Sequence, residues 1–169
     1  MSTSLSQSLL PEFDHEMANT RKTLERVPEG VPDFTPHARS MTLARLAGHV
    51  ADIPRWAILG LDRREFDMEP VDQPTPVPAD MTSRPALLAD FDGKVAGARA
   101  LLVAATDDVM LQMWTLKKGG HTILSMPRVT VLRTFVLNHI IHHRAQLGVY
   151  LRLNNIAVPS LYGPSADEM

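Results

Sequence analysis

The chain has 169 residues, a hydrophobic share of 44% and a formal charge of −2, which suits one domain with a real core. The charges are mixed and form no basic cluster, so nucleic acid is not expected as a partner. The sequence contains no cysteine, which excludes disulfides, thiolate ligands and a cysteine nucleophile, so any thiol must come with a substrate. No signal peptide and no bilayer-length apolar run is recognised, so a cytoplasmic protein without a membrane partner is expected.

Four amphipathic segments repeat apolar residues in steps of three and four, as the helices of a bundle do. The first covers about residues 9–26, and a turn with proline and glycine follows it. The second starts near Ser40 or Thr42, which are both suitable N-caps, and reaches about Ala57. Pro54 interrupts this segment and predicts a kink, because proline lacks the backbone N–H of a helical hydrogen bond.

The remaining segments complete the predicted fold. Residues 61–82 lose the periodicity and are rich in proline, which indicates a semi-extended connection that could be a lid or a crossover. A third helix is predicted from Ser83 to about residue 107, and a short hairpin over residues 113–124. The fourth helix opens after Pro127 and ends at Asn154 and Asn155. We therefore expect a single domain over residues 1–169, an all-α four-helix bundle with long connections.

The fourth helix carries two histidines at positions where a bundle normally has leucine or isoleucine. His139 and His143 are four residues apart, so their side chains lie one above the other on one helix face. His142 is an alternative partner for His139, but it turns away from the apolar face. His49, beside the apolar stripe of the second helix, is the only other histidine expected on an inner helix side.

Three imidazoles from two helices would suit zinc, nickel, iron or copper. Three protein ligands leave one coordination position open for water or substrate, as in catalytic zinc sites. Histidines four apart also occur on exposed helix faces or as hydrogen-bonded core residues. The spacing alone supports both interpretations of His49, His139 and His143.

Other polar residues lie where they could take part in such a site. Asp52 follows the histidine of the second helix by three residues and could orient it by accepting a hydrogen bond, or could be a solvated carboxylate. Glu12 and His15 have the spacing of a di-iron motif, but the sequence holds no second copy, so an exposed His15 is expected. His121 falls in the hairpin loop and is not expected in a site. Trp114 is expected to cap the end of the bundle.

At residues 138–147 the sequence Asn-His-Ile-Ile-His-His-Arg-Ala-Gln-Leu, with Tyr-Leu-Arg at 150–152, resembles the signature of the DinB/YfiT-like proteins. The Leu-Ala-Gly-His-Val stretch at 46–50 and the tail at 158–167 resemble the same family. The resemblance therefore spans essentially the whole chain. The family usually has glycine where this chain has Ala145.

The resemblance implies a four-helix bundle, often dimeric, in which three histidines hold a divalent metal; these correspond to His49, His139 and His143. Family members include thiol-dependent S-transferases and a mycothiol-dependent isomerase, and many others are described as metal-dependent hydrolases. The implied function is a metal-dependent thiol S-transferase or hydrolase that acts on a small electrophile. Its expected cofactor is Zn, Ni or Fe, and its expected partners are a small-molecule substrate, a low-molecular-weight thiol and a second copy of the chain.

Two alternatives to an enzyme remain open at this point. The first is a non-catalytic metal-binding, dimerising module of a stress response, and the second is a plain bundle with core histidines. The sequence singles out no catalytic side chain. Arg144 could recognise an anionic substrate, but a solvated position on the helix face is favoured. Gln146 and Tyr150 could donate hydrogen bonds either to the metal ligands or within the core.

Overall fold

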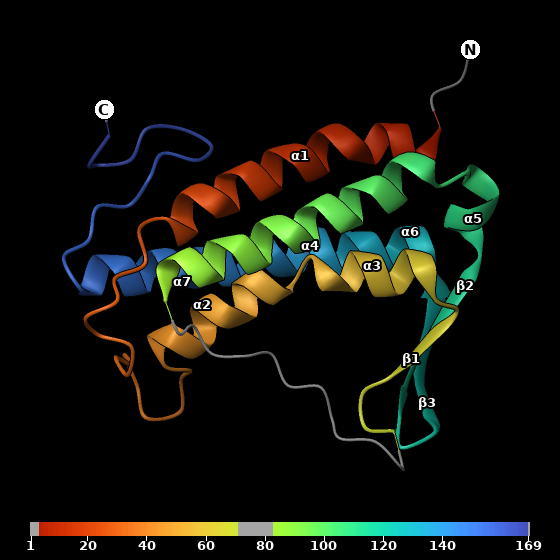
Figure 1. The fold of residues 1–169 in the computed structure, drawn as a ribbon, viewed down its shortest axis with the longest axis horizontal. Helices are drawn as coiled ribbons and strands as arrows, with labels where there is room; N and C mark the ends of the chain where they lie inside the picture. Colours follow the sequence, from red (N-terminus) through yellow and green to blue (C-terminus); the bar gives the residue numbers. More distant parts are fainter. Residues whose placement is uncertain (1–3, 71–82, 169) are drawn as a thin grey trace.

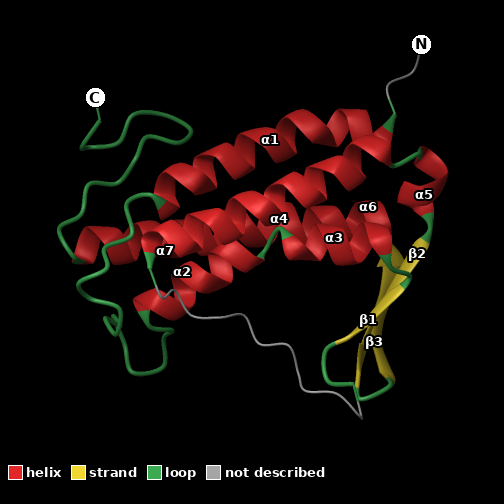
Figure 2. Ribbon diagram, in the orientation of Figure 1, coloured by secondary structure: helices red, strands yellow, loops and turns green. Residues whose placement is uncertain are grey.

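A computed structural model of the chain describes residues 4–70 and 83–168 and shows helices with a small sheet at one end (Figures 1 and 2). The helices are α1 (Leu5–Leu24), α2 (Leu43–Asp52), α3 (Arg55–Asp62), α4 (Arg84–Ala104), α5 (Asp107–Leu111), α6 (Arg128–Val131), the π-helix η1 (Leu132–Asn138) and α7 (His139–Leu153). The strands are β1 (Glu65–Asp67), β2 (Met113–Lys118) and β3 (His121–Pro127), in the order β1-β2-β3. None of the helices in these two ranges has the length and apolar character needed to cross a membrane.

Side-chain caps explain where four of the helices begin. Ser4, Thr42, Ser83 and Thr106 each accept a hydrogen bond from the backbone amide three residues further on. Such a bond satisfies one of the amides that has no partner within the helix. The predicted caps at Thr42 and Ser83 are confirmed. The first helix begins earlier than the sequence predicted, which places Pro11 inside it.

The helices pack around one main core. Helix α4 lies against α1, α2 and α3, while α7 contacts α1 and α2 (Figure 1). The core is filled by the apolar faces of these helices, with Phe13, Phe91, Leu102, Ile140 and Leu147 among its largest fully buried side chains. Because α2 and α7 are neighbours, side chains from the second and fourth predicted helices can meet.

The kink predicted at Pro54 is a complete break between two helices. Helix α2 ends at Asp52 and α3 begins at Arg55. Around the break, the amide of Ile53 bonds to the carbonyl of Val50, and the amide of Trp56 bonds to the carbonyl of Ile53. Hydrogen bonds between residues three apart thus replace the α-helical bonds between residues four apart, because proline provides no N–H.

The all-α prediction is wrong in part, because three strands form a sheet. The hairpin predicted over 113–124 is confirmed, with Gly119 and Gly120 at φ of 56° and 78° in its turn. The unpredicted strand β1 adds in parallel to β2, with Phe66 opposite Leu116. Strand β1 falls in the stretch 61–82 that was expected to be a connection, and residues 71–82 of that stretch lie outside the described residues.

Trp114 is fully buried where the sheet meets the helices, with Leu116 and Val131 beside it. Its indole Nε1 donates to the carbonyl of Leu59 at 3.2 Å. A buried indole that lacked this partner would lose a hydrogen bond to water without replacement. Trp114 therefore joins the sheet to α3 and the α6 segment, at the end of the helical part.

Arg144 is buried, which corrects the expectation of a solvated arginine. Only 2% of the residue is exposed. One guanidinium nitrogen donates to the carbonyl of Glu16 at 3.0 Å and to the hydroxyl of Thr20 at 3.1 Å. The other donates to the Glu16 carboxylate at 2.6 Å and to the Tyr162 hydroxyl. Arg144 thereby connects α7 to α1 and to the C-terminal tail.

We predict that Arg144→Met destabilises the fold by about 3–5 kcal/mol, because it leaves the Glu16 carboxylate buried without its ionic partner. Arg152→Met is the matched control on the same helix. The Arg152 side chain is 50% exposed in its ion pair with Asp167, so its loss should cost about 1 kcal/mol or less. Urea unfolding of the metal-free proteins measures both changes. Equal losses for the two variants would contradict the role given to Arg144.

Candidate metal centre

The structure brings together His49 of α2 with His139 and His143 of α7. One ring nitrogen from each lies within 4.8 Å of the others. The Nε2 atoms of His49 and His139 are 3.2 Å apart. Two nitrogens on one tetrahedral zinc ion lie about 3.4 Å apart, given Zn–N distances of about 2.0–2.1 Å. The spacing therefore fits a shared ion, and in residues 4–70 and 83–168 no other group of three histidines or carboxylates is placed in this way.

The Nε2 atom of His139 is directed towards the cluster by a hydrogen bond on the far side of its ring. Nδ1 of His139 donates to the carbonyl of Phe135 at 3.3 Å. Phe135 belongs to the π-helix η1, which ends immediately before His139. π-Helical turns are rare and often occur at functional sites. The sequence did not reveal this turn, since no residue pattern distinguishes it from ordinary helix.

Gln146 orients His143 in the same manner. Nδ1 of His143 donates to Oε1 of Gln146 at 2.7 Å, which leaves the Nε2 lone pair free for an ion. The role of Gln146 beside a ligand was one of the two interpretations of the sequence, although it acts here as an acceptor. For Tyr150 the other interpretation holds, because its hydroxyl donates to the backbone carbonyl of Met41 at 2.9 Å.

Asp52 takes part in ion pairs beside the cluster. Its carboxylate accepts from Nε of Arg55 at 3.1 Å and lies 2.9 Å from the amine of Lys94. Across the described residues, it makes no hydrogen bond to His49. Asp52 acts on His49 through its negative charge alone, which opposes the other influences on the pKa of that imidazole.

Burial keeps the three imidazoles neutral. It lowers the pKa of His49 to about 4, helped by the charges that His143 and His139 would carry. Burial also lowers the pKa of His139 and of His143. A neutral imidazole has the lone pair that a metal needs, whereas a protonated one has none. All three rings are therefore ready to ligate at neutral pH.

The other histidines considered from the sequence lie apart from this cluster. His142 is exposed and lies 3.2 Å from the side-chain amide of Gln146. His15 is exposed, as predicted, and bonds to Asn19 at 3.0 Å, while Glu12 lies 3.3 Å from Arg133. His121 is exposed at the start of β3.

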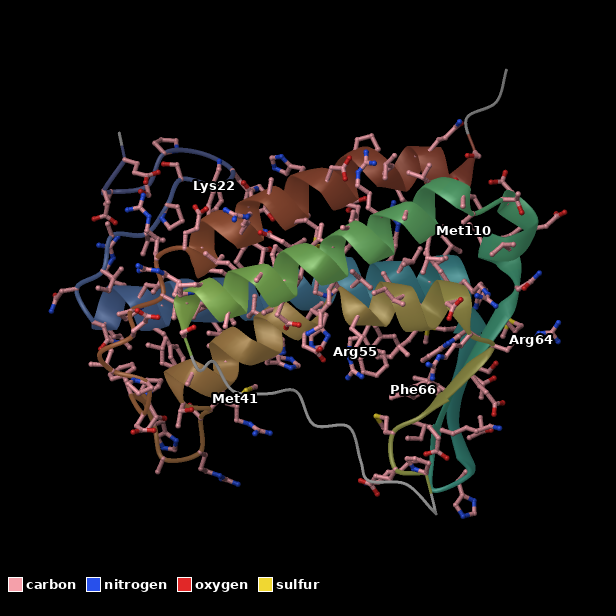
Figure 3. All side chains as sticks on the ribbon, in the orientation of Figure 1. Lys22, Met41, Arg55, Arg64, Phe66 and Met110 are labelled. Carbon is pink, nitrogen blue, oxygen red and sulfur yellow. The ribbon has the colours of Figure 1, made fainter. Side chains whose placement is uncertain are left out.

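Each of the three clustered histidines also lines a different cavity. The largest, of about 540 Å³, lies beside His49 and between α2, α3 and the β1 segment. One of about 410 Å³ adjoins His143, and one of about 300 Å³ adjoins His139. Each clustered histidine therefore borders space that a small molecule could enter. Figure 3 labels three lining residues of the largest cavity: Met41 before α2, Arg55 at the start of α3 and Phe66 on β1.

The residues of the largest cavity include some that sequence reasoning missed, notably Arg55, Trp56 and Phe66. A partial signal was present, because Trp56 follows His49 by seven residues, which is two helical turns. Phe66 could not be found in this way, since its strand is short and its partner strand lies far away in the sequence.

Comparisons with known proteins identify the family of the chain. The sequence model of the DinB superfamily matches residues 12–147, a range that contains all three clustered histidines. No curated protein matches the chain.

Two solved structures are similar in fold. A DinB-like protein from Bacillus cereus ATCC 10987 is 20% identical with a TM-score of 0.73, covering 96% of this chain and 100% of that one. A DinB-like protein from Bacillus subtilis is 16% identical with a TM-score of 0.68, covering 92% and 99%. At these identities the likeness concerns the fold. The family model spans most of the sequence and agrees with the resemblance found in its motifs, so the chain belongs to the DinB superfamily.

Proposed function

We propose that the chain binds one divalent metal ion through His49, His139 and His143 and uses it to activate a small thiol or water for attack on a small electrophile. This would make it a metal-dependent thiol S-transferase or hydrolase. The observation that carries the proposal is the convergence of three neutral imidazoles within 4.8 Å. In this proposal the helices form a four-helix bundle that holds the ion, which would be Zn, Ni or Fe, on its inner side.

When bound, such an ion supplies Lewis acidity and lowers the pKa of a water or thiol at its open position. The residues of the chain supply the rest. Phe135 and Gln146 hold the Nδ1 sides of His139 and His143, so both Nε2 lone pairs point inward. Burial keeps these rings unprotonated. The Nε2 of His49, on α2, lies 3.2 Å from the Nε2 of His139.

The cavities favour an enzyme over a closed metal-binding module. A purely structural site surrounds its ion with protein ligands, whereas a catalytic site keeps one position reachable. Here separate cavities adjoin His49 and His143, with volumes of about 540 and 410 Å³. Two cavities could hold two small molecules, which supports transfer of a thiol brought from outside. We also propose that the thiol is of low molecular weight and that the chain forms a homodimer. Light scattering tests the homodimer.

We predict that His49→Ala, His139→Ala and His143→Ala each lose most of the bound metal, since two imidazoles hold an ion far more weakly than three. Plasma emission should find about one ion per wild-type chain and well under half of that in each variant. His121→Ala, changed at an exposed site on β3, should keep the full content. Unchanged metal content in all three of these histidine variants would disprove the site.

The same proteins test the activity. Metal-loaded wild type should accelerate the reaction of glutathione or cysteine with 1-chloro-2,4-dinitrobenzene, or the hydrolysis of 4-nitrophenyl acetate without a thiol. The variants of His49, His139 and His143 should lose this activity, and His121→Ala should keep it. A protein that holds its ion but accelerates neither reaction, nor others in a wider screen of thiols and electrophiles, would fit the non-catalytic module.

Gln146→Leu should weaken metal affinity by about 10–100-fold, because His143 loses the acceptor that orients its ring. Gln146→Glu keeps an oxygen acceptor at the same place and should retain most of the affinity. Competition with a chromogenic chelator measures both constants. Equal weakening in the two variants would show that the Gln146–His143 hydrogen bond at 2.7 Å does not position the ligand.

The metal-free protein should lose stability as the pH falls from about 6.5 towards 4. The pKa of His49 is about 4 when folded and 6.5 ordinarily, so in this window the unfolded chain binds more protons than the folded one. Melting temperatures at pH 7.5 and 5, with chelator present, measure the effect. His49→Gln should show a smaller drop than wild type, and His121→Gln the wild-type drop. The same drop in His49→Gln would contradict the buried neutral state of His49.

A further inference from the structure

The largest cavity has one wall built from a single face of α2 and α3. Arg45, His49, Ile53 and Trp56 recur in steps of four, four and three, and all four line the cavity. The β1 segment also lines the cavity, through Phe66 (Figure 3) and through Met68. Its volume of about 540 Å³ falls among those of small-molecule sites, which span about 300–1,000 Å³. A molecule in this cavity would share a wall with the metal cluster.

The wall of the cavity offers a flat, rigid aromatic surface. The Trp56 ring stacks on Phe135, with centroids 5.6 Å apart and an interplanar angle of 25°. It meets Phe66 edge to face at 5.7 Å, and Trp114 supports it at 6.4 Å. Trp56 itself is only half-buried and lines the cavity. Because the Trp56 ring is already held in place, little side-chain entropy would be lost when a ligand binds. Such a ring favours a ligand with a planar apolar body that can lie against it.

The acidic side chains of this cavity already have basic partners. Asp52 pairs with Arg55 at 3.1 Å and with Lys94 at 2.9 Å. Glu69 pairs with Lys118 at 3.0 Å. A cationic ligand would have to displace one of these bases. The cavity wall therefore gives an anion the advantage, and an ion bound at the histidines would add positive charge to that wall.

Arg55 is the group placed to receive that anion. It bonds to Asp52 through Nε alone, and in the part of the chain that the structure describes its two terminal nitrogens make no hydrogen bond. The guanidinium carbon lies 6.0 Å from the centre of the Phe66 ring, so the group is held from two sides. Two parallel N–H donors on a fixed guanidinium match the two oxygens of a carboxylate.

We propose that the cavity between α2, α3 and β1 binds a small carboxylate with a planar apolar body. The carboxylate pairs with the terminal nitrogens of Arg55, and the apolar body lies against Trp56 and Phe66. The rest of the molecule extends towards His49. The inference rests on the proposed function, since it names the class of electrophile that the metal centre would act on: a molecule with a carboxylate, a planar apolar body and a separate electrophilic carbon that lies towards His49.

The test compares 3-phenylpropionate with its uncharged amide, 3-phenylpropionamide, by calorimetry on zinc-loaded protein. Wild type should bind the acid about 10-fold or more tightly than the amide, as expected for charge-assisted hydrogen bonds. Arg55→Gln should lower acid affinity to that of the amide and leave amide affinity unchanged. Arg55→Lys, which keeps the charge without the paired donors, should fall between them. Trp56→Leu should weaken both compounds.

Zinc content and far-UV circular dichroism are measured on each variant. Asp52 keeps Lys94 as a partner in Arg55→Gln, so the fold should be retained. Equal affinity for acid and amide in wild type would overturn the proposal. So would unchanged acid binding in Arg55→Gln with loss in His139→Ala, since the carboxylate would then bind the zinc. If the protein binds no metal but still prefers the acid to the amide through Arg55, the carboxylate site is correct and the proposed function is wrong.

If the protein shows metal-dependent activity but binds acid and amide equally, the proposed function is correct and the carboxylate site is wrong.

Discussion

The meeting of three uncharged imidazoles between α2 and α7 is the constraint on which the proposed metal site depends. Each ring occupies a half-buried place that leucine would fill in an ordinary bundle. Putting a polar ring there forfeits hydrophobic burial and removes water from its nitrogens. The hydrogen bonds of His139 to Phe135 and of His143 to Gln146 offset part of that cost. A ligand that binds only the folded cluster would offset more, by mass action.

That meeting requires α7 to keep one rotation about its axis, and the buried arginine helps to set it. Arg144 faces α1 and the tail, where Glu16 and Tyr162 receive its guanidinium, while the neighbouring His143 faces α2. Because the two residues are adjacent in one helix, a rotation that moved His143 away from the cluster would also break the Arg144 network. A buried ion pair contributes little net stability but can favour one arrangement over others. Here the favoured arrangement is the one that assembles the histidines.

Sequence reasoning found the parts of the site that follow local rules. The four-residue spacing of His139 and His143 put them on one face, and the apolar stripe beside His49 placed it inward. Sequence reasoning failed where the surroundings of a residue come from segments far away in the sequence. The burial of Arg144 depends on Glu16, 128 residues away in the sequence. The π-helical turn before His139 has no compositional signal, and strand β1 has three residues, too few to show an alternating pattern.

Two elements that the sequence did not predict, the π-helix η1 and strand β1, meet around the largest cavity beside the helix break at Pro54. The break at Pro54 lets its wall follow two helix axes, from His49 on α2 to Trp56 on α3. Phe135, from the unforeseen π-helix, supports the Trp56 ring, and Phe66, from the unforeseen strand, closes the opposite side. The three clustered histidines come from helices whose periodicity is visible in the sequence. The cavity wall comes from a helix break and a short strand that are brought together only by tertiary contacts. The sequence therefore predicts the proposed metal ligands more readily than the residues that would determine substrate specificity.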